Sequence, residues 1–143
     1  MSRRPPSERS EYSVFWPITT RWEDNDQYGH VNNVAYYSWF DTAVNAWLVA
    51  QGLLDPANGD QIGLVVESSC RYFRPLSFPQ RVQIGIRTGR IGTSSIVWKL
   101  GAFTFDDPRA AAEGRFIHVY VDRERRRPIS ISATWRQALT PFS

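Results

Sequence analysis

The segment NVAYYSWFDTAVNAWLVAQG, residues 33–52, decides the fold because it is the one long stretch with helical periodicity. At 3.6 residues per turn, one broad face is apolar and carries Tyr36, Tyr37, Phe40, Ala43, Val44, Trp47 and Leu48. Gly52 is typical of the position just past a helix end. The segment therefore predicts a long amphipathic helix that packs its apolar face on another surface.

The sequence on both sides of this helix has strand character. Upstream, SVFWPITTRW (13–22) places Trp16, Ile18, Thr20 and Trp22 on one face, and Pro17 indicates an edge position or a strand start. Downstream, turn residues separate four strand-like segments: GLVVESSCRYFRPL (63–76), RVQIGIRTG (81–89), SSIVWKLGAFTF (94–105) and GRFIHVYVD (114–122).

Apolar residues alternate with other residues in the predicted strands. Val82, Ile84 and Ile86 form one such set, and Ile117, Val119 and Val121 repeat the pattern, so the sheet should bury one face. The order of elements predicts an α+β fold in which a strand, the long helix and four strands in a meander form an antiparallel sheet with the helix on its buried face. The segment SATWRQALTP (132–141) predicts a short final helix.

Composition limits the class of protein. The 143 residues, of which 42% are hydrophobic, suit a single domain over 13–143, preceded by a charged, proline-containing tail over 1–12 that we expect to be disordered. Aromatic residues make up 14% of the chain, which favours an oligomer or an apolar ligand. The net charge of +3 is weak evidence for nucleic acid, and we predict that nucleic acid is not a partner. A single cysteine and the lack of a long apolar run predict a cytoplasmic protein that does not bind a membrane.

The segment RWEDNDQYGHVNN (21–33), just before the helix, has the spacing of a calcium loop but lacks its ligands. Asp24 and Asp26 take the first and third loop positions, yet the fifth is Tyr28 and the twelfth is Ala35 where a bidentate Glu is required. A strand also precedes the loop, where an EF-hand has a helix. With two histidines and one cysteine in the chain, we predict no metal and no other cofactor.

The same segment also leads into a helix N-terminus, which has chemistry of its own. Unpaired N–H groups and the positive end of the helix dipole polarise a carbonyl or hold an oxyanion, and either Asp24 or Asp26 could face that carbonyl. The alternative is a structural role, in which an Asp or Asn caps the helix; Asn32 and Asn33 are equally suited to this. The spacing leaves both interpretations open.

The motif Asp-x-Asp-x-x-Gly-His-Val-Asn-Asn, followed by VAYYSWFDTA (34–43), closely resembles the hotdog-fold acyl-CoA thioesterases of the 4-hydroxybenzoyl-CoA thioesterase family. RYFRPLSFPQRVQIGIR (71–87) is similar to that family's Pro-Leu corner and the strand after it, and the resemblance extends over residues 13–123. It implies an antiparallel sheet wrapped around one long helix. It also implies a homodimer or homotetramer with each active site between two subunits.

The resemblance further implies hydrolysis of an acyl-CoA thioester, with an acyl-ACP substrate left open. The second Asp of the motif, Asp26, would act as nucleophile or general base, and the amide of Asn33 would polarise the thioester carbonyl. Family members carry His or an aromatic residue at the position of Asn33, so this chain departs from them there. His30 either assists the water or makes a structural hydrogen bond.

Five residues are candidates for substrate binding: Tyr28, Glu67, Ser69, Arg71 and Arg74. Glu67 and Ser69 either reach the site from the partner subunit or are ordinary polar strand residues. Arg71 and Arg74 are among the cations available for the CoA phosphates. The alternative functions are a non-hydrolytic hotdog protein that binds acyl thioesters and a purely structural dimer module. The sequence does not identify the acyl group.

Overall fold

The computed structural model describes residues 4–143, in which there are two helices and five strands. The helices are α1 (Asn33–Ala50) and α2 (Ala133–Leu139). The strands are β1 (Val14–Ile18), β2 (Gln61–Tyr72), β3 (Val82–Ile91), β4 (Ser95–Thr104) and β5 (Ala112–Asp122). Short 3-10 turns are η1 (Arg9–Glu11), η2 (Trp22–Asp24) and η3 (Thr140–Phe142). Neither helix of this described part is long and apolar enough to span a lipid bilayer.

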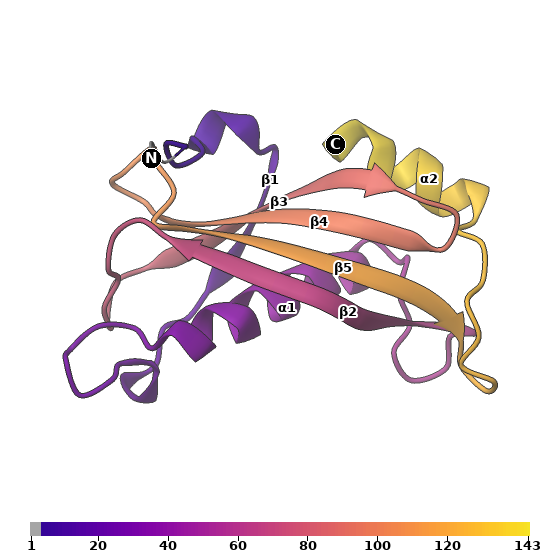
Figure 1. Cartoon of the computed structure of the whole chain (residues 1–143), viewed down its shortest axis with the longest axis horizontal. Coiled ribbons are helices and arrows are strands. Elements are labelled where there is room, and N and C mark those ends of the chain that lie inside the picture. The colour runs from indigo at the N-terminus through magenta and orange to yellow at the C-terminus, as the bar shows by residue number, and fades with distance from the viewer. Residues whose placement is uncertain (1–3) are drawn as a thin grey trace.

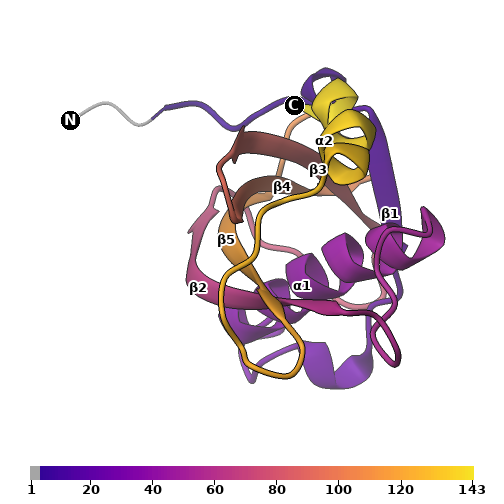
Figure 2. The same ribbon diagram turned by 90° about the vertical axis from the view of Figure 1, so that its right-hand side faces the viewer.

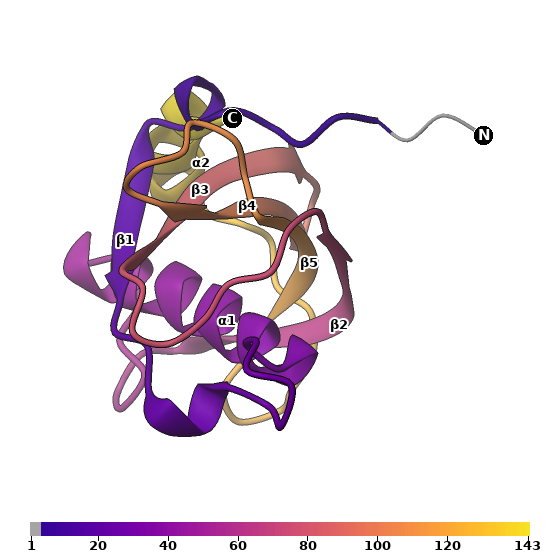
Figure 3. The same cartoon turned by 90° about the vertical axis from the view of Figure 1, so that its left-hand side faces the viewer.

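The strands form one antiparallel sheet in the order β1-β3-β4-β5-β2. The sheet curls around α1, with β1 and β2 as its two edges (Figure 1 and Figure 2). Figure 3 shows the same arrangement from the end at which α1 begins. This confirms the predicted α+β class and the hotdog arrangement of a sheet around one long helix.

Only part of the predicted meander is correct. The strands β3, β4 and β5 are adjacent and in sequence order, but β2 pairs with β5 and not with β3. Residues 73–81 therefore carry the chain from one edge of the sheet to a strand near the other edge. Consecutive strands are neighbours in most sheets but not in all, and sequence order cannot identify the exceptions.

The first strand is shorter than predicted. It ends at Ile18, and its exposed Pro17 lies on an edge strand as expected. Trp22 belongs to η2 and is 80% exposed, so it does not share the buried face that the alternation predicted.

The packing of α1 against the sheet forms most of the core. Its buried side chains are Tyr36, Trp39, Phe40, Ala43, Val44, Trp47 and Leu48. The predicted face is confirmed except that Trp39 is buried as well and Tyr37 is half-buried. Phe40 meets the sheet at Gly114, where an added Cβ would lie 2.5 Å from the Phe40 ring. Gly114 therefore allows the helix to approach the sheet closely.

The side chains of β5 differ from the prediction. Ile117 and Val119 are only half-buried, whereas Phe116, His118 and Tyr120 are buried, and the Phe116 ring contacts Phe40 of α1. Both sets alternate along the strand, so periodicity alone did not decide which set faces the helix.

The N-terminal segment also differs from the prediction of a disordered tail over 1–12. Residues 1–3 lie outside the described part of the chain, but Ser7 donates its N–H to Glu113 and Glu8 forms a β-bridge with Arg109. Tyr12 is buried and packs edge-on against Phe103, with ring centroids 5.5 Å apart. These contacts anchor residues 7–12 on the outer face of the sheet despite their polar composition.

The predicted C-terminal helix is confirmed as α2. Ser132 caps it, because its side chain accepts a hydrogen bond from the Trp135 N–H. The Trp135 ring packs edge-on against Tyr120 at 4.9 Å, and Leu139 is fully buried. The helix thus closes one end of the core.

His118 is a buried titratable group in this core. It is 2% exposed and lies among the rings of Trp98, Phe116 and Tyr120. Its Nδ1 lies 3.5 Å from the Tyr120 hydroxyl, and its Nε2 has no hydrogen-bond partner among residues 4–143. Burial lowers the pKa of His118 below its ordinary value of 6.5.

We predict that His118 makes the protein less stable in mild acid. Below pH 6.5 the unfolded chain binds a proton that the folded chain resists, so the free energy of unfolding should fall as the pH drops from 7.5 to 5.5. Urea unfolding at the two pH values measures the effect. His118→Gln should remove most of the difference, and His30→Gln, which alters an exposed histidine, should retain it. An unchanged pH dependence in His118→Gln would contradict the assignment.

Candidate active site

Asp26 lies in a tight turn between η2 and α1. Its Oδ1 accepts hydrogen bonds from the N–H groups of Tyr28 (2.8 Å) and His30 (3.4 Å). The Asp26 N–H donates to the His30 carbonyl (2.8 Å), and Gly29 has a positive φ of 81° that suits glycine. These bonds fix one carboxylate oxygen, and within residues 4–143 the other oxygen, Oδ2, receives no hydrogen bond.

Asp24 has a structural environment. It is 2% exposed, and its carboxylate accepts hydrogen bonds from the Arg21 N–H (2.8 Å) and the Arg21 guanidinium (2.9 Å). Its carbonyl accepts the N–H of Asn32 (2.7 Å). Asp24 therefore holds the approach to α1, whereas Asp26 lines a cavity.

The helix cap is Asn32. Its side-chain oxygen accepts the Val34 N–H at 3.0 Å, which is the usual N-cap bond. Asn33 is the first helical residue, and its N–H is one of the groups that a helix start leaves unpaired. The sequence could not choose between the two asparagines, because either side chain is chemically suited to the cap.

Asp26 and Asn33 open onto one cavity of about 420 Å³. The turn and the start of α1 form one wall, and the end of β2 with the residues after it forms the other. Its lining residues are Asp26, His30, Val31, Asn33, Tyr36, Tyr72, Phe73, Arg74 and Pro75. The structure thus brings together all three predicted catalytic residues, Asp26, Asn33 and His30, and one predicted substrate-binding residue, Arg74.

Two tyrosines in this cavity are additions to the predicted site. Burial raises the pKa of Tyr36 to about 12, so its hydroxyl stays protonated at neutral pH. The Tyr72 hydroxyl donates a hydrogen bond to the Asn33 carbonyl at 3.3 Å and so ties the end of β2 to the helix start. Strand alternation predicts that Tyr72 and Arg71 lie on opposite faces of the sheet. It does not predict that Tyr72 lies beside Asn33.

Two residues at the end of β4 and just after it hold Arg74 in place. Its guanidinium donates to the Thr104 hydroxyl (3.0 Å), and its Nε lies 3.3 Å from an Asp107 carboxylate oxygen. Asp107 therefore offsets part of the positive charge that Arg74 brings to the cavity edge.

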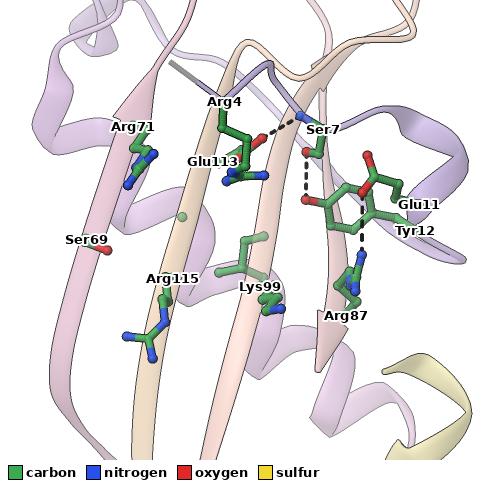
Figure 4. A pocket seen from close by; sticks show the side chains of 12 residues that line it. Arg4, Ser7, Glu11, Tyr12, Ser69, Arg71, Arg87, Lys99, Glu113 and Arg115 are labelled. Atoms are coloured by element: carbon green, nitrogen blue, oxygen red, sulfur yellow. Dashed lines mark hydrogen bonds and ion pairs between the residues drawn. The ribbon is translucent and has the colours of Figure 1, made fainter. Parts of the chain in front are cut away.

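The other predicted substrate-binding residues lie elsewhere in this subunit. Tyr28 is 77% exposed and contributes only its N–H to Asp26. Glu67, Ser69 and Arg71 pair with Ile117, Arg115 and Glu113 on the outer face of the sheet, away from α1. Ser69 and Arg71 line a second cavity there (Figure 4).

The cavity contains the parts for attack on a polarised carbonyl. Asp26, the first residue of α1 and the neutral phenol of Tyr36 line one space, and Tyr72 and Phe73 add aromatic rings to its wall. No group of three or more His, Cys, Asp or Glu side chains comes together within residues 4–143 to hold a metal ion.

The chain is similar to proteins of known structure. The PA5185 protein of Pseudomonas aeruginosa strain PAO1 is 50% identical, with a TM-score of 0.93 and 97% of each chain covered. PA2801 of Pseudomonas aeruginosa, a proposed thioesterase, is 32% identical over 87% of this chain and 95% of its own, with a TM-score of 0.80. A thioesterase of Thermus thermophilus, solved with coenzyme A and zinc, shares the fold with a TM-score of 0.75. It is 24% identical over 92% of this chain and 95% of its own.

The family comparison agrees with these structures and with the hotdog thioesterase resemblance of the motif. The model of the Thioesterase-like superfamily matches residues 20–139, which includes the Asp26 turn, α1 and the whole sheet except β1. The chain belongs to the Thioesterase-like superfamily.

Proposed function

We propose that the protein hydrolyses an acyl-CoA thioester to the free acid and CoA, with Asp26 as nucleophile or general base. The observation that carries this proposal is that Asp26 and the amide end of α1 line the same cavity, and that within residues 4–143 one carboxylate oxygen of Asp26 accepts no hydrogen bond. Membership of the Thioesterase-like superfamily supports the reaction class. The coenzyme A bound to the Thermus thermophilus thioesterase supports CoA as the carrier.

In this mechanism the thioester carbonyl oxygen accepts a hydrogen bond from the Asn33 N–H. The positive end of the α1 dipole then stabilises the charge that develops on that oxygen. Asp26 either attacks the carbonyl carbon or removes a proton from the attacking water. The tetrahedral intermediate collapses when the C–S bond breaks, and the thiolate of CoA leaves. With water as the attacking group this step gives the free acid directly, whereas attack by Asp26 leaves an acyl-Asp26 anhydride that water then hydrolyses to the free acid and the Asp26 carboxylate.

The remaining cavity residues have supporting roles in this proposal. Tyr36 is a neutral hydrogen-bond donor beside the reaction centre, and Tyr72 holds the helix start in place. His30 lines the cavity from the same turn as Asp26, where it assists the water. The aromatic wall suits an acyl group, whose identity depends on how these rings accommodate it.

We also propose that the working unit is a homodimer or homotetramer. The edge strand β2 leaves its outer side without a partner strand within residues 4–143, and Leu64, Val65 and Val66 on it are 37–59% exposed. A second copy would cover both the open hydrogen-bonding edge and this apolar surface. That Glu67 and Ser69 reach the site of the partner subunit stays a prediction, because both lie on the outer face of the sheet in this subunit.

Asp26→Asn tests the catalytic assignment. The side chain keeps its size and an acceptor oxygen for the turn, but it loses the charge needed for attack or for proton removal. We expect kcat to fall roughly 10²- to 10⁴-fold with little change in KM. The assay is free thiol release from a panel of aliphatic and aromatic acyl-CoAs, with binding of a non-hydrolysable thioester analogue measured in parallel.

Asp24→Asn is the matched control for this test. It should lower the urea midpoint, because it weakens a buried contact to Arg21, and should leave kcat near that of the unaltered protein. Loss of turnover in Asp24→Asn with retention in Asp26→Asn would reverse the assignment. An unaltered protein that binds the analogue but releases no thiol from any substrate would instead favour a non-hydrolytic thioester-binding protein.

Val66→Lys tests the oligomer. Sedimentation at micromolar concentration should show a species of at least twice 16.5 kDa for the unaltered chain. In the Val66→Lys variant, the charge on the β2 edge should shift the equilibrium toward the monomer. Val49→Lys places the same charge on an exposed residue of α1 and should leave the assembly intact. A species of 16.5 kDa for the unaltered chain would overturn the proposal.

A further inference from the structure

The second cavity lies on the outer face of the sheet and has a volume of about 480 Å³. The strands β2, β3, β4 and β5 form its floor, and the N-terminal segment forms one wall (Figure 4). We call it the basic trough. It is lined by Arg4, Ser7, Glu11, Tyr12, Ser69, Arg71, Arg87, Lys99, Leu100, Glu113, Gly114 and Arg115.

Strand alternation separates the trough from the reaction cavity. Gly114 faces Phe40 of α1, so its neighbours Glu113 and Arg115 project from the opposite face. On β2, Arg71 faces the trough whereas the adjacent Tyr72 lines the Asp26 cavity. The two cavities share no lining residue within the described part of the chain, so the trough has no part in the chemistry proposed for Asp26.

The charge of the trough is strongly positive. Five cationic side chains line it against two carboxylates, whereas the chain as a whole carries only +3. The two carboxylates already have partners, since Glu113 pairs with Arg4 and Glu11 lies 3.8 Å from Arg87. The positive side chains come from four strands that lie side by side and from the N-terminal segment, which concentrates their field in one place.

Two cations and one buried donor of the trough have no protein partner among the described residues. Within residues 4–143, Arg71 and Lys99 have no carboxylate within 4.0 Å. The buried Nε of Arg87 has no hydrogen-bond partner there either. An anion with several acceptor oxygens would satisfy these groups through charge-assisted hydrogen bonds.

We propose that the basic trough binds the diphosphate group of a nucleotide. The sheet forms the floor of the trough and the N-terminal segment forms one side, where Ser7 and Tyr12 hydrogen-bond to each other at 3.0 Å. Arginine and lysine together are the side chains that hold phosphate oxygens in proteins. A diphosphate offers enough charge and oxygens to engage Arg71, Arg87 and Lys99 at once.

The test compares two variants with the same change in net charge. Arg71→Gln/Lys99→Gln removes two exposed, unpaired cations from the trough, so the fold should be retained. Arg125→Gln/Arg127→Gln removes two exposed cations from the turn after β5. Calorimetry measures the binding of inorganic pyrophosphate and of ADP at low salt, where electrostatic binding is strongest.

We expect the trough variant to bind both ligands at least roughly tenfold more weakly than the unaltered protein, and the turn variant to bind them normally. Circular dichroism and the urea midpoint establish that both variants are folded. The proposal is overturned if the unaltered protein binds neither ligand, or if the two variants lose affinity equally, because the effect would then be one of net charge.

Kinetics then distinguish the source of the diphosphate. If it belongs to the CoA of a substrate, the trough variant should raise KM for the acyl-CoA, leave kcat unchanged and leave hydrolysis of the acyl-pantetheine thioester unaffected. If it belongs to a free nucleotide, KM for the acyl-CoA should be unchanged while ADP binding is lost. Either result supports the trough. Asp26→Asn should bind pyrophosphate normally, so failure of the proposed hydrolysis would be separable from failure of this site.

Discussion

The packing of α1 against the sheet is the constraint on which the remaining structure depends. Phe40 lies directly on Gly114, where no side chain separates helix from strand, and the sheet can therefore curl around the helix. Seven α1 side chains are at most 5% exposed: Tyr36, Trp39, Phe40, Ala43, Val44, Trp47 and Leu48. Burial of this much apolar surface is the main stabilising contribution available to a domain of this size. A residue larger than glycine at position 114 would clash with the Phe40 ring, so the ring or the helix would have to shift.

The candidate active site follows from where this packing places the start of α1. Because the helix is fixed along its length, its first residues lie beside the end of β2, and the Tyr72 hydroxyl reaches the Asn33 carbonyl there. Two aspartates stabilise the segment before the helix through different hydrogen bonds. Asp24 is buried and holds Arg21, and Asp26 is the aspartate of this pair that lines the cavity.

The two faces of the sheet carry different chemistry because neighbouring strand residues point in opposite directions. On the inner face, aromatic rings and the helix start surround a cavity with one free carboxylate oxygen. On the outer face, cations of four adjacent strands gather beside the N-terminal segment. A basic excess that is small over the whole chain thus becomes a concentrated positive field at one place.

The sequence by itself determined the α+β class, the extent and apolar face of α1, the short C-terminal helix and the Asp26–Asn33 motif, because each is a local pattern of period, cap or spacing. Only the tertiary structure decided the place of β2 beside β5, the burial of His118 in place of Ile117, and the order in residues 7–12. These features depend on contacts between residues far apart in the chain. The alternation of side chains divides a strand into two sets without showing which set is buried, so only packing against α1 identifies the inner face.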